Sequence, residues 1–170
     1  MSAIQVAPYD ESWPHLFQEE RGRLLELLGE IIDEVHHVGS TSIAGLTAKR
    51  KIDIDAVLRE STHLPEAVER VKGRRDFTFH GDPYADGMWT FTSGHGSYGY
   101  RLYLCGPDNP THIKRILFRD WLRNHPDDAA TYAALKRQLA AEAGGDWKFY
   151  TGGKSNFVAS IVEQAASHCL

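Results

Sequence analysis

The sequence predicts an α+β fold, with a small mixed β-sheet flanked by helices and a helical C-terminal half. Apolar residues recur at helical spacing near the start of the chain and through most of its last third. Short segments rich in β-branched and aromatic residues, typical of strands, gather in the middle. No linker, repeat or low-complexity tract interrupts the 170 residues, a length that suits one sizeable core, so we expect a single domain over residues 1–170.

The first part of the chain is expected to alternate helices and strands. Proline suits the first turn of a helix, where its missing N–H would be unpaired in any case, and Pro14 and Pro65 each open a stretch with helical spacing. Residues 52–58 alternate apolar and acidic residues at their start, as a half-buried strand does. The predicted elements are a helix from Ser12 to about Gly29, strands at 35–38 and 52–58, and a helix from Pro65 to about Lys72.

Three more strands are expected in the middle of the chain, at residues 77–80, 88–92 and 98–104. The segment 93–97, Ser-Gly-His-Gly-Ser, lies between the last two. Clusters of glycine and serine favour turns. We therefore expect these two strands to form an antiparallel hairpin.

The remainder of the chain is expected to be helical. Asn109 and Pro110 are residue types preferred at an N-cap and in a first helical turn. Acidic residues at 127 and 128 suit the positive N-terminus of a following helix. The predicted helices begin at Asn109–Pro110, run from Pro126 to Gly144–Gly145, and run from Asn156 to about Ala166.

The charge composition excludes some classes of protein. Lysine plus arginine is 19 and aspartate plus glutamate is 23, giving a formal net charge of −4. A general nucleic-acid coat would need an excess of basic residues, although a local basic patch is compatible with this balance. No apolar run approaches the about 18 to 20 residues that span a bilayer, and the first residues lack a signal-peptide pattern. Two cysteines, Cys105 and Cys169, are too few for a disulfide framework, so we expect a cytoplasmic protein with no membrane partner.

One segment has the residue types of a phosphate site. Gly39-Ser40 is followed, after twelve residues, by Asp53-Ile54-Asp55 on a predicted strand. Residues two apart on a strand face the same side, so the two carboxylates repel each other unless a cation lies between them. Mg²⁺ takes oxygen ligands and shares them with substrate phosphates, while glycine and neighbouring hydroxyls let a loop approach a phosphate. Either half alone is common in ordinary turns and strand edges, but together they predict phosphoryl or nucleotidyl transfer.

This order of residues resembles the signature of the nucleotidyltransferase superfamily, whose fold is the DNA polymerase beta type. Within it, the chain resembles the GrpB family over nearly its whole length. The matching segments are Tyr9-Asp10-x-x-Trp13-Pro14, His37-Val38-Gly39-Ser40-Thr41-Ser42-Ile43-x-Gly45-Leu46-x-Ala48-Lys49, Ile52-Asp53-Ile54, Phe118-Arg119-Asp120-Trp121-Leu122-Arg123-x-His125-Pro126, Tyr132-x-x-Leu135-Lys136 and Lys154-x-x-Phe157.

The resemblance implies a nucleotidyltransferase-like fold, a candidate site and an activity. The implied activity is Mg²⁺-dependent transfer of a nucleoside monophosphate from an NTP to an unknown small-molecule, protein or RNA acceptor. The implied phosphate-binding residues are Gly39, Ser40, Thr41 and Ser42, and the implied ligands of Mg²⁺ or Mn²⁺ are Asp53 and Asp55.

The chain departs from the superfamily pattern at the third metal ligand. Active members carry a third carboxylate on a later strand, where this chain has Arg101 and Tyr103. Arg101 would repel a cation but bind a phosphate, and Asp82 or Asp86 is an alternative source of the third acid. Without a third acid, two alternatives stay open: a nucleotide- or phosphate-binding module without catalysis, or a structural or interaction protein on the same fold.

Basic side chains add candidates for phosphate contact: Lys49, Lys51, Arg101, Arg119 and Lys154. Arg119 lies in a stripe with Arg115 and Arg123, each four residues apart on one predicted helix. Such a stripe either binds phosphates or is a solvated face paired with acids such as Asp120.

Overall fold

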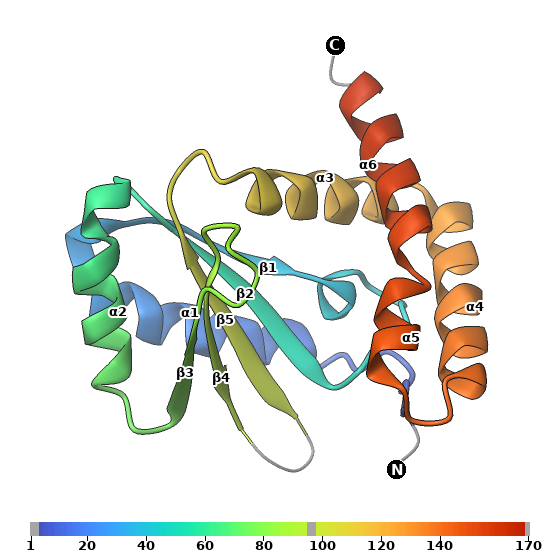
Figure 1. Ribbon diagram of the computed structural model, residues 1–170, viewed down its shortest axis with the longest axis horizontal. Coiled ribbons are helices and arrows are strands. Elements are labelled where there is room, and N and C mark those ends of the chain that lie inside the picture. The colour runs from blue at the N-terminus through green and yellow to red at the C-terminus, as the bar shows by residue number, and fades with distance from the viewer. Residues whose placement is uncertain (1–3, 95–97, 169–170) are drawn as a thin grey trace.

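Residues 4–94 and 98–168 are described by the computed structural model in Figure 1. Within these ranges the chain forms one five-stranded sheet and six α-helices. The strands are β1 (Ile32–Val38), β2 (Lys51–Leu58), β3 (Phe77–Gly81), β4 (Trp89–Ser93) and β5 (Gly99–Cys105). The helices are α1 (Trp13–Leu28), α2 (Leu64–Lys72), α3 (Pro110–Asn124), α4 (Pro126–Glu142), α5 (Trp147–Gly152) and α6 (Ser155–His168).

The sheet is mixed, as the sequence predicts. Its strand order is β1-β2-β5-β4-β3, in which β2 and β5 are parallel and the other neighbours are antiparallel. β4 and β5 form the expected hairpin, with Trp89 opposite Leu104. β2 has a hydrogen-bonded neighbour on each side, so two ladders fix the positions of its side chains.

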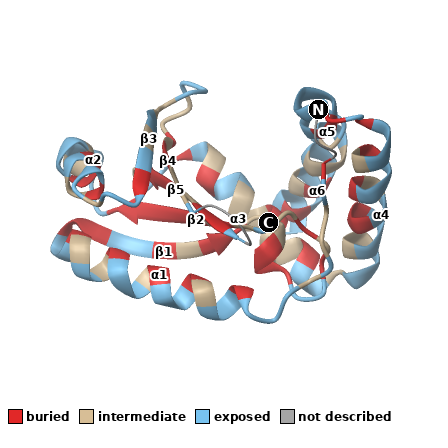
Figure 2. Ribbon diagram, turned by 90° about the horizontal axis from the view of Figure 1, so that it is seen from below, coloured by how far each residue is buried: buried red, intermediate tan, exposed pale blue. Residues whose placement is uncertain are grey.

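The main core lies between one face of the sheet and helices α1 and α2. Ile52 and Ile54 of β2 are fully buried there with Leu24 of α1 and Val71 of α2. α1 runs along the sheet beside β1, with its buried positions turned inward (Figure 2). Burying each large apolar side chain contributes roughly 1.5–3 kcal/mol to the stability of the fold. The even-numbered residues of β2 therefore face this core, and the odd-numbered residues lie on the opposite face of the sheet.

The C-terminal helices form a second core of their own. Phe118 of α3, Tyr132 of α4 and Ile161 of α6 pack with Ile43 and Leu46, which belong to the connection between β1 and β2. α4, α5 and α6 lie together at one end of the sheet in Figure 1. The second core therefore anchors the Gly39–Lys49 connection against the helices.

Each predicted element is present, and the differences are local. β1 begins at Ile32 rather than at residue 35. Asn109 caps α3 as expected, with Oδ1 accepting from the N–H of His112 at 3.0 Å. α5 is not predicted, because its six residues are too short to show helical periodicity. Residues 95–97 of the predicted hairpin loop, and Cys169, lie outside the described residues, while Cys105 is buried.

The described part of the chain contains no helix with both the length and the apolar character needed to cross a bilayer.

Candidate functional site

The two candidate metal ligands lie on β2, on the face turned away from α1 and α2. Asp53 lies opposite Arg101 of β5, and Asp55 lies opposite Tyr103. Because alternate residues of β2 are buried against α1, both carboxylates point toward the C-terminal helices. The strand thus brings the two acids to one face, but their surroundings differ.

The Asp55 carboxylate is enclosed by residues of α3. Its side chain is fully buried, with Oδ1 accepting from Nη1 of Arg115 at 2.8 Å and Oδ2 lying 2.9 Å from Nδ1 of His112. The Arg115 guanidinium also lies 3.9 Å from the centre of the Tyr103 ring. Arginine is weakly hydrated and presents several donors, which suits a buried ion pair. The charge of Asp55 is therefore balanced inside the protein, and this pair joins β2 to α3.

Asp53 is the more open carboxylate. Its side chain is 24% exposed and lines a cavity at the start of β2, with Nη1 of Arg101 at 4.0 Å from Oδ1. Burial raises the pKa of Asp53, and the charges of Arg101 and Arg115 oppose that shift. Arg101 therefore points into the site, where it balances the charge of Asp53.

Gly39 brings the loop after β1 into contact with Asp53. Its φ of 71° and ψ of −175° lie in a region that is essentially restricted to glycine. A Cβ at this position would lie 2.7 Å from Oδ2 of Asp53, closer than non-bonded atoms approach. Both the backbone conformation and the lack of a side chain are thus required for the loop to pack on β2.

Replacing Gly39 by alanine is expected to lower the free energy of unfolding by about 2–4 kcal/mol, because backbone strain of about 1–3 kcal/mol adds to the clash with Asp53. Gly45→Ala is the matched control, since Gly45 also has a positive φ of 78° but has nothing within 4 Å of its Cβ position. Urea denaturation should show the larger loss for Gly39→Ala. Equal losses would mean that Asp53 moves aside without cost.

The hydroxyls of the loop are mostly used to hold its shape. Ser42 donates to the carbonyl of Gly39 at 2.6 Å, and Thr41 donates to the carbonyl of Lys51 at 3.3 Å. Nε2 of His37 lies 2.9 Å from the Thr41 hydroxyl, so His37 orients the loop. Ser40 and Thr41 both line the cavity, and because the Thr41 hydroxyl already has two partners, Ser40 is the one we expect to contact a ligand.

The arginine stripe of α3 is neither a simple solvated face nor a set of open phosphate contacts. Arg115 binds Asp55, Arg119 donates to the carbonyl of His37 at 3.1 Å, and Arg123 donates to the carbonyl of Ser42 at 2.7 Å. Arg119 also pairs with its neighbour in sequence, as the alternative interpretation expects. Arg119 and Arg123 therefore hold the loop after β1 in place, while Arg115 holds β2. Direct contact of Arg119 with a ligand stays a prediction.

The cavity beside Asp53 is strongly cationic. Its volume is about 180 Å³, and it lies between the loop after β1, the start of β2, helices α4 and α5, and the connection from α5 to α6. Asp53 is the one acidic residue among the described residues that line it. The cationic residues that line it are Lys49, Lys51, Arg101, Lys136 and Lys154. The structure thus brings four of the five predicted basic contacts together and adds Lys136.

Lys136 is the site residue to which the sequence gives no role. Its side chain is almost completely buried, and its ammonium donates to the carbonyl of Thr47 and lies 4.8 Å from the centre of the Tyr132 ring. Burial lowers the pKa of Lys136 to about 7, helped by the charge of Lys154. Burial likewise lowers the pKa of Lys154 to about 8, helped by the charge of Lys49. Holding a buried and a half-buried lysine close together is costly unless an anion joins them.

Neither alternative source of a third acid is free. The Asp82 carboxylate accepts from the backbone N–H groups of Asp86 and Gly87, and Asp86 Oδ2 accepts from the hydroxyl of Thr111. Both acids therefore stabilise the loop before β4. In residues 4–94 and 98–168, no group of three or more His, Cys, Asp or Glu residues is placed to hold a metal ion. In this arrangement the protein offers a metal ion one open carboxylate, Asp53, which does not make a site by itself.

Comparisons with known proteins agree on the family. Residues 3–164 match the family model described as "GrpB protein". A UPF0157 protein of Pseudomonas aeruginosa, PA4798, is 36% identical over 169 residues, covering 95% of this chain and 67% of that protein. A UPF0157 protein of Bacillus subtilis, YqkA, is 33% identical over 162 residues, and the chain spans about half of its length (47%).

Solved structures agree on the fold. A conserved protein GrpB from Enterococcus faecalis superposes with a TM-score of 0.86 at 27% identity, covering 96% of this chain and 98% of that one. The GLD-2/RNP-8 complex gives a TM-score of 0.61 at 9% identity, covering 92% and 58%. The Cid1 poly(U) polymerase, in a structure described as "Mg 3'-dATP bound", gives 0.53 at 11% identity, covering 87% and 49%. These likenesses confirm the predicted nucleotidyltransferase-like α+β fold.

Proposed function

The chain belongs to the GrpB family, and from that premise we propose that it binds the phosphates of a nucleoside triphosphate in the cationic cavity, without needing a metal ion. The charge balance of the cavity carries the proposal. Five cationic side chains line it, against the single carboxylate of Asp53 among the described residues. Cations held close together disfavour one another, and a bound anion removes that cost.

The size of the cavity indicates which part of the ligand it takes. At about 180 Å³ it is smaller than the about 300–1,000 Å³ of sites that enclose a whole small molecule. It therefore holds the charged end of a ligand, while the remainder extends outward. Gly39 and Ser40 also line the cavity, so the backbone of the loop after β1 lies beside the proposed phosphates.

The fold supports a nucleotide as the source of the phosphates. A protein with the same fold, the Cid1 poly(U) polymerase, is described with 3'-dATP bound. At 11% identity that likeness extends to the fold alone, so the residues that would bind a nucleotide here are argued from the cavity itself. A protein that binds inorganic triphosphate but no nucleotide would contradict this part of the proposal.

The test is titration calorimetry with each NTP and with inorganic triphosphate, in chelator and in Mg²⁺. The wild type should bind in chelator. The double variant Lys136→Met with Lys154→Met should bind at least about tenfold more weakly. The attraction between one ammonium and one phosphate charge about 10 Å away, at an effective dielectric constant of 20, is about 1.7 kcal/mol. Lys114→Met is the matched control, because Lys114 is exposed on α3 and does not line the cavity. Equal affinities for the double variant and the control would overturn the proposal.

Metal-dependent nucleotidyl transfer is the second candidate, favoured by one observation. Asp53 and Asp55 share a face of β2, and Asp53 touches the Gly39 loop, as the superfamily resemblance implies for Mg²⁺ ligands. Transfer requires Asp55 to be released from Arg115, and the third acid to come from elsewhere.

Asp53→Asn separates the two candidates when calorimetry is combined with an assay of pyrophosphate release. If the cationic cavity binds the phosphates directly, removing this negative charge should tighten binding in chelator, by about tenfold on the same Coulomb estimate. If Asp53 acts through a metal ion, the variant should instead lose Mg²⁺-dependent binding and release no pyrophosphate. The second pattern would place the chain with the transferases.

A further inference from the structure

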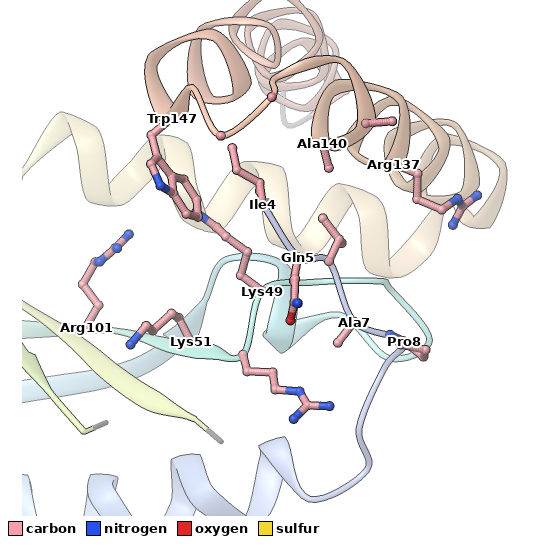
Figure 3. A pocket seen from close by; sticks show the side chains of 15 residues that line it. Ile4, Gln5, Ala7, Pro8, Lys49, Lys51, Arg101, Arg137, Ala140 and Trp147 are labelled. Atoms are coloured by element: carbon pink, nitrogen blue, oxygen red, sulfur yellow. The ribbon is translucent and has the colours of Figure 1, made fainter. Parts of the chain in front are cut away.

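A second, larger depression continues from the cavity and is also basic. It is an open groove of about 1,260 Å³ between the N-terminal segment Ile4–Pro8, the start of β2, and helices α4 and α5. Figure 3 shows Trp147 beside Lys49, and Arg137 on the side away from Arg101 and Lys51. Lys49, Lys51 and Arg101 line both the groove and the cavity, so the two spaces are continuous.

The charge of the groove is opposite to that of the whole chain. Arg50 and Arg137 are exposed and line the groove but not the cavity, adding to the three shared cations. Among the described residues that line the groove, none is acidic. In a protein of net charge −4, this concentration of positive charge in a concave surface favours an anionic partner.

The groove also contains an open aromatic surface. Trp147 is 50% exposed, with the ammonium of Lys49 at 4.5 Å from its ring centre on one side. The indole also packs edge-on against Tyr150, with ring centres 6.2 Å apart, and planar bases stack on exposed rings of this kind with little regard to sequence. Acidic peptides supply the charge but lack a planar ring at regular intervals along the chain.

We propose that this groove binds a single-stranded nucleic acid, with its phosphates on Arg50, Arg137 and the shared cations and a base stacked on Trp147. A cationic groove combined with an aromatic platform is the usual arrangement for single strands. The groove exceeds the about 300–1,000 Å³ of sites for one small molecule, so it has room for several nucleotides. The inference shares Lys49, Lys51 and Arg101 with the nucleotide proposal, but Arg50, Arg137 and Trp147 lie outside the cavity and allow it to be tested separately.

Fluorescence anisotropy with a labelled ten-nucleotide RNA of mixed sequence tests the inference. Trp147→Ala should weaken binding roughly 5- to 150-fold, which corresponds to about 1–3 kcal/mol for losing one base stack. Phe149→Ala is the matched control, since Phe149 lies on the same helix, is 46% exposed and does not line the groove.

The charge of the groove is tested separately. Arg50→Ala with Arg137→Ala should weaken binding and reduce the slope of log K against log salt concentration by about 1.4, at about 0.7 for each phosphate contact. Arg75→Ala, an exposed arginine before β3, should leave both unchanged.

Two further measurements distinguish an error in this inference from an error in the nucleotide proposal. Lys136→Met with Lys154→Met should keep RNA binding, because neither residue lines the groove. A polyglutamate peptide of equal charge should compete at least about tenfold less well than unlabelled RNA, because it lacks bases to stack. Equal effects of Trp147→Ala and Phe149→Ala, or equal competition by polyglutamate, would overturn the inference.

Discussion

Replacing Asp55 by alanine is expected to lower the free energy of unfolding by about 3–5 kcal/mol, the usual cost of leaving a buried charge without its partner. Asp55 is fully buried, and its two oxygens meet Arg115 at 2.8 Å and His112 at 2.9 Å. The substitution leaves the guanidinium of Arg115 without a counter-ion between β2 and α3. Because whole domains are stable by about 5–15 kcal/mol, this single change should be visible directly in urea denaturation.

Asp33→Ala is the control for Asp55→Ala. Asp33 forms an exposed ion pair with Arg59 at 3.5 Å, and removing such a pair changes stability by about 0–1 kcal/mol. Adding Arg115→Met to Asp55→Ala should recover part of the lost stability, since the uncompensated charge is then gone. A loss no larger than that of Asp33→Ala would show that Asp55 is unpaired in solution, as a metal ligand would be.

The secondary structure could be predicted because each element has a local signal. Pro14, Pro65, Pro110 and Pro126 each lie in the first turn of a helix, and the side chain of Asn109 caps α3. A signal for α5 was present too, in Asp146 at its N-cap, whose carboxylate accepts from the backbone N–H groups of Lys148 at 2.9 Å and Phe149 at 3.0 Å. A cap without periodicity, in six residues, does not distinguish a helix from a turn.

The candidate site could be predicted in part. The spacing of Gly39 and Asp53, and the alternation of β2, indicate which residues meet, and Lys49 and Lys154 do line the same cavity. The partners of Asp55 could not be found this way, because Arg115 is sixty positions away on a helix whose orientation depends on the second core.

The burial of Lys136 could not be predicted from the sequence either. Its position on α4 gives no sign that the side chain is 2% exposed, since lysines are most often at the surface. Burial of a lysine depends on which face of α4 meets the connection after β1, and that is decided by tertiary packing.

The affinity for phosphates should fall as the pH rises through 7 and 8. Over the same range the free energy of unfolding of the free protein should rise. In the folded protein the pKa of Lys136 is about 7, against 10.5 for an ordinary lysine. Between these values the unfolded chain holds a proton that the folded chain lacks, so the free energy of unfolding rises with pH. A bound anion favours the charged ammonium, so affinity falls over the range in which Lys136 loses its proton.

The size of that effect follows from the pKa of Lys136. From pH 6 to pH 8 a group with a pKa of about 7 passes from mostly charged to mostly neutral, which lowers affinity about tenfold if only the charged form binds. The charged groups that face Lys136 are Lys49, Arg137 and Lys154, and Lys154, with a pKa of about 8, adds a smaller decrease in the same direction. The phosphates titrate as well, so the comparison is made with Lys136→Met, in which the ligand behaves identically.

Calorimetry of triphosphate binding at pH 6, 7 and 8 should therefore show a decrease about tenfold steeper for the wild type than for Lys136→Met. At pH 7, repeating the titration in buffers of different ionisation enthalpy should detect uptake of about half a proton in the wild type that the variant lacks. Lys114→Met should behave as the wild type. The same pH dependence in wild type and Lys136→Met would mean that Lys136 stays neutral beside the bound phosphates, and that Lys49, Lys51, Arg101 and Lys154 supply the binding charge.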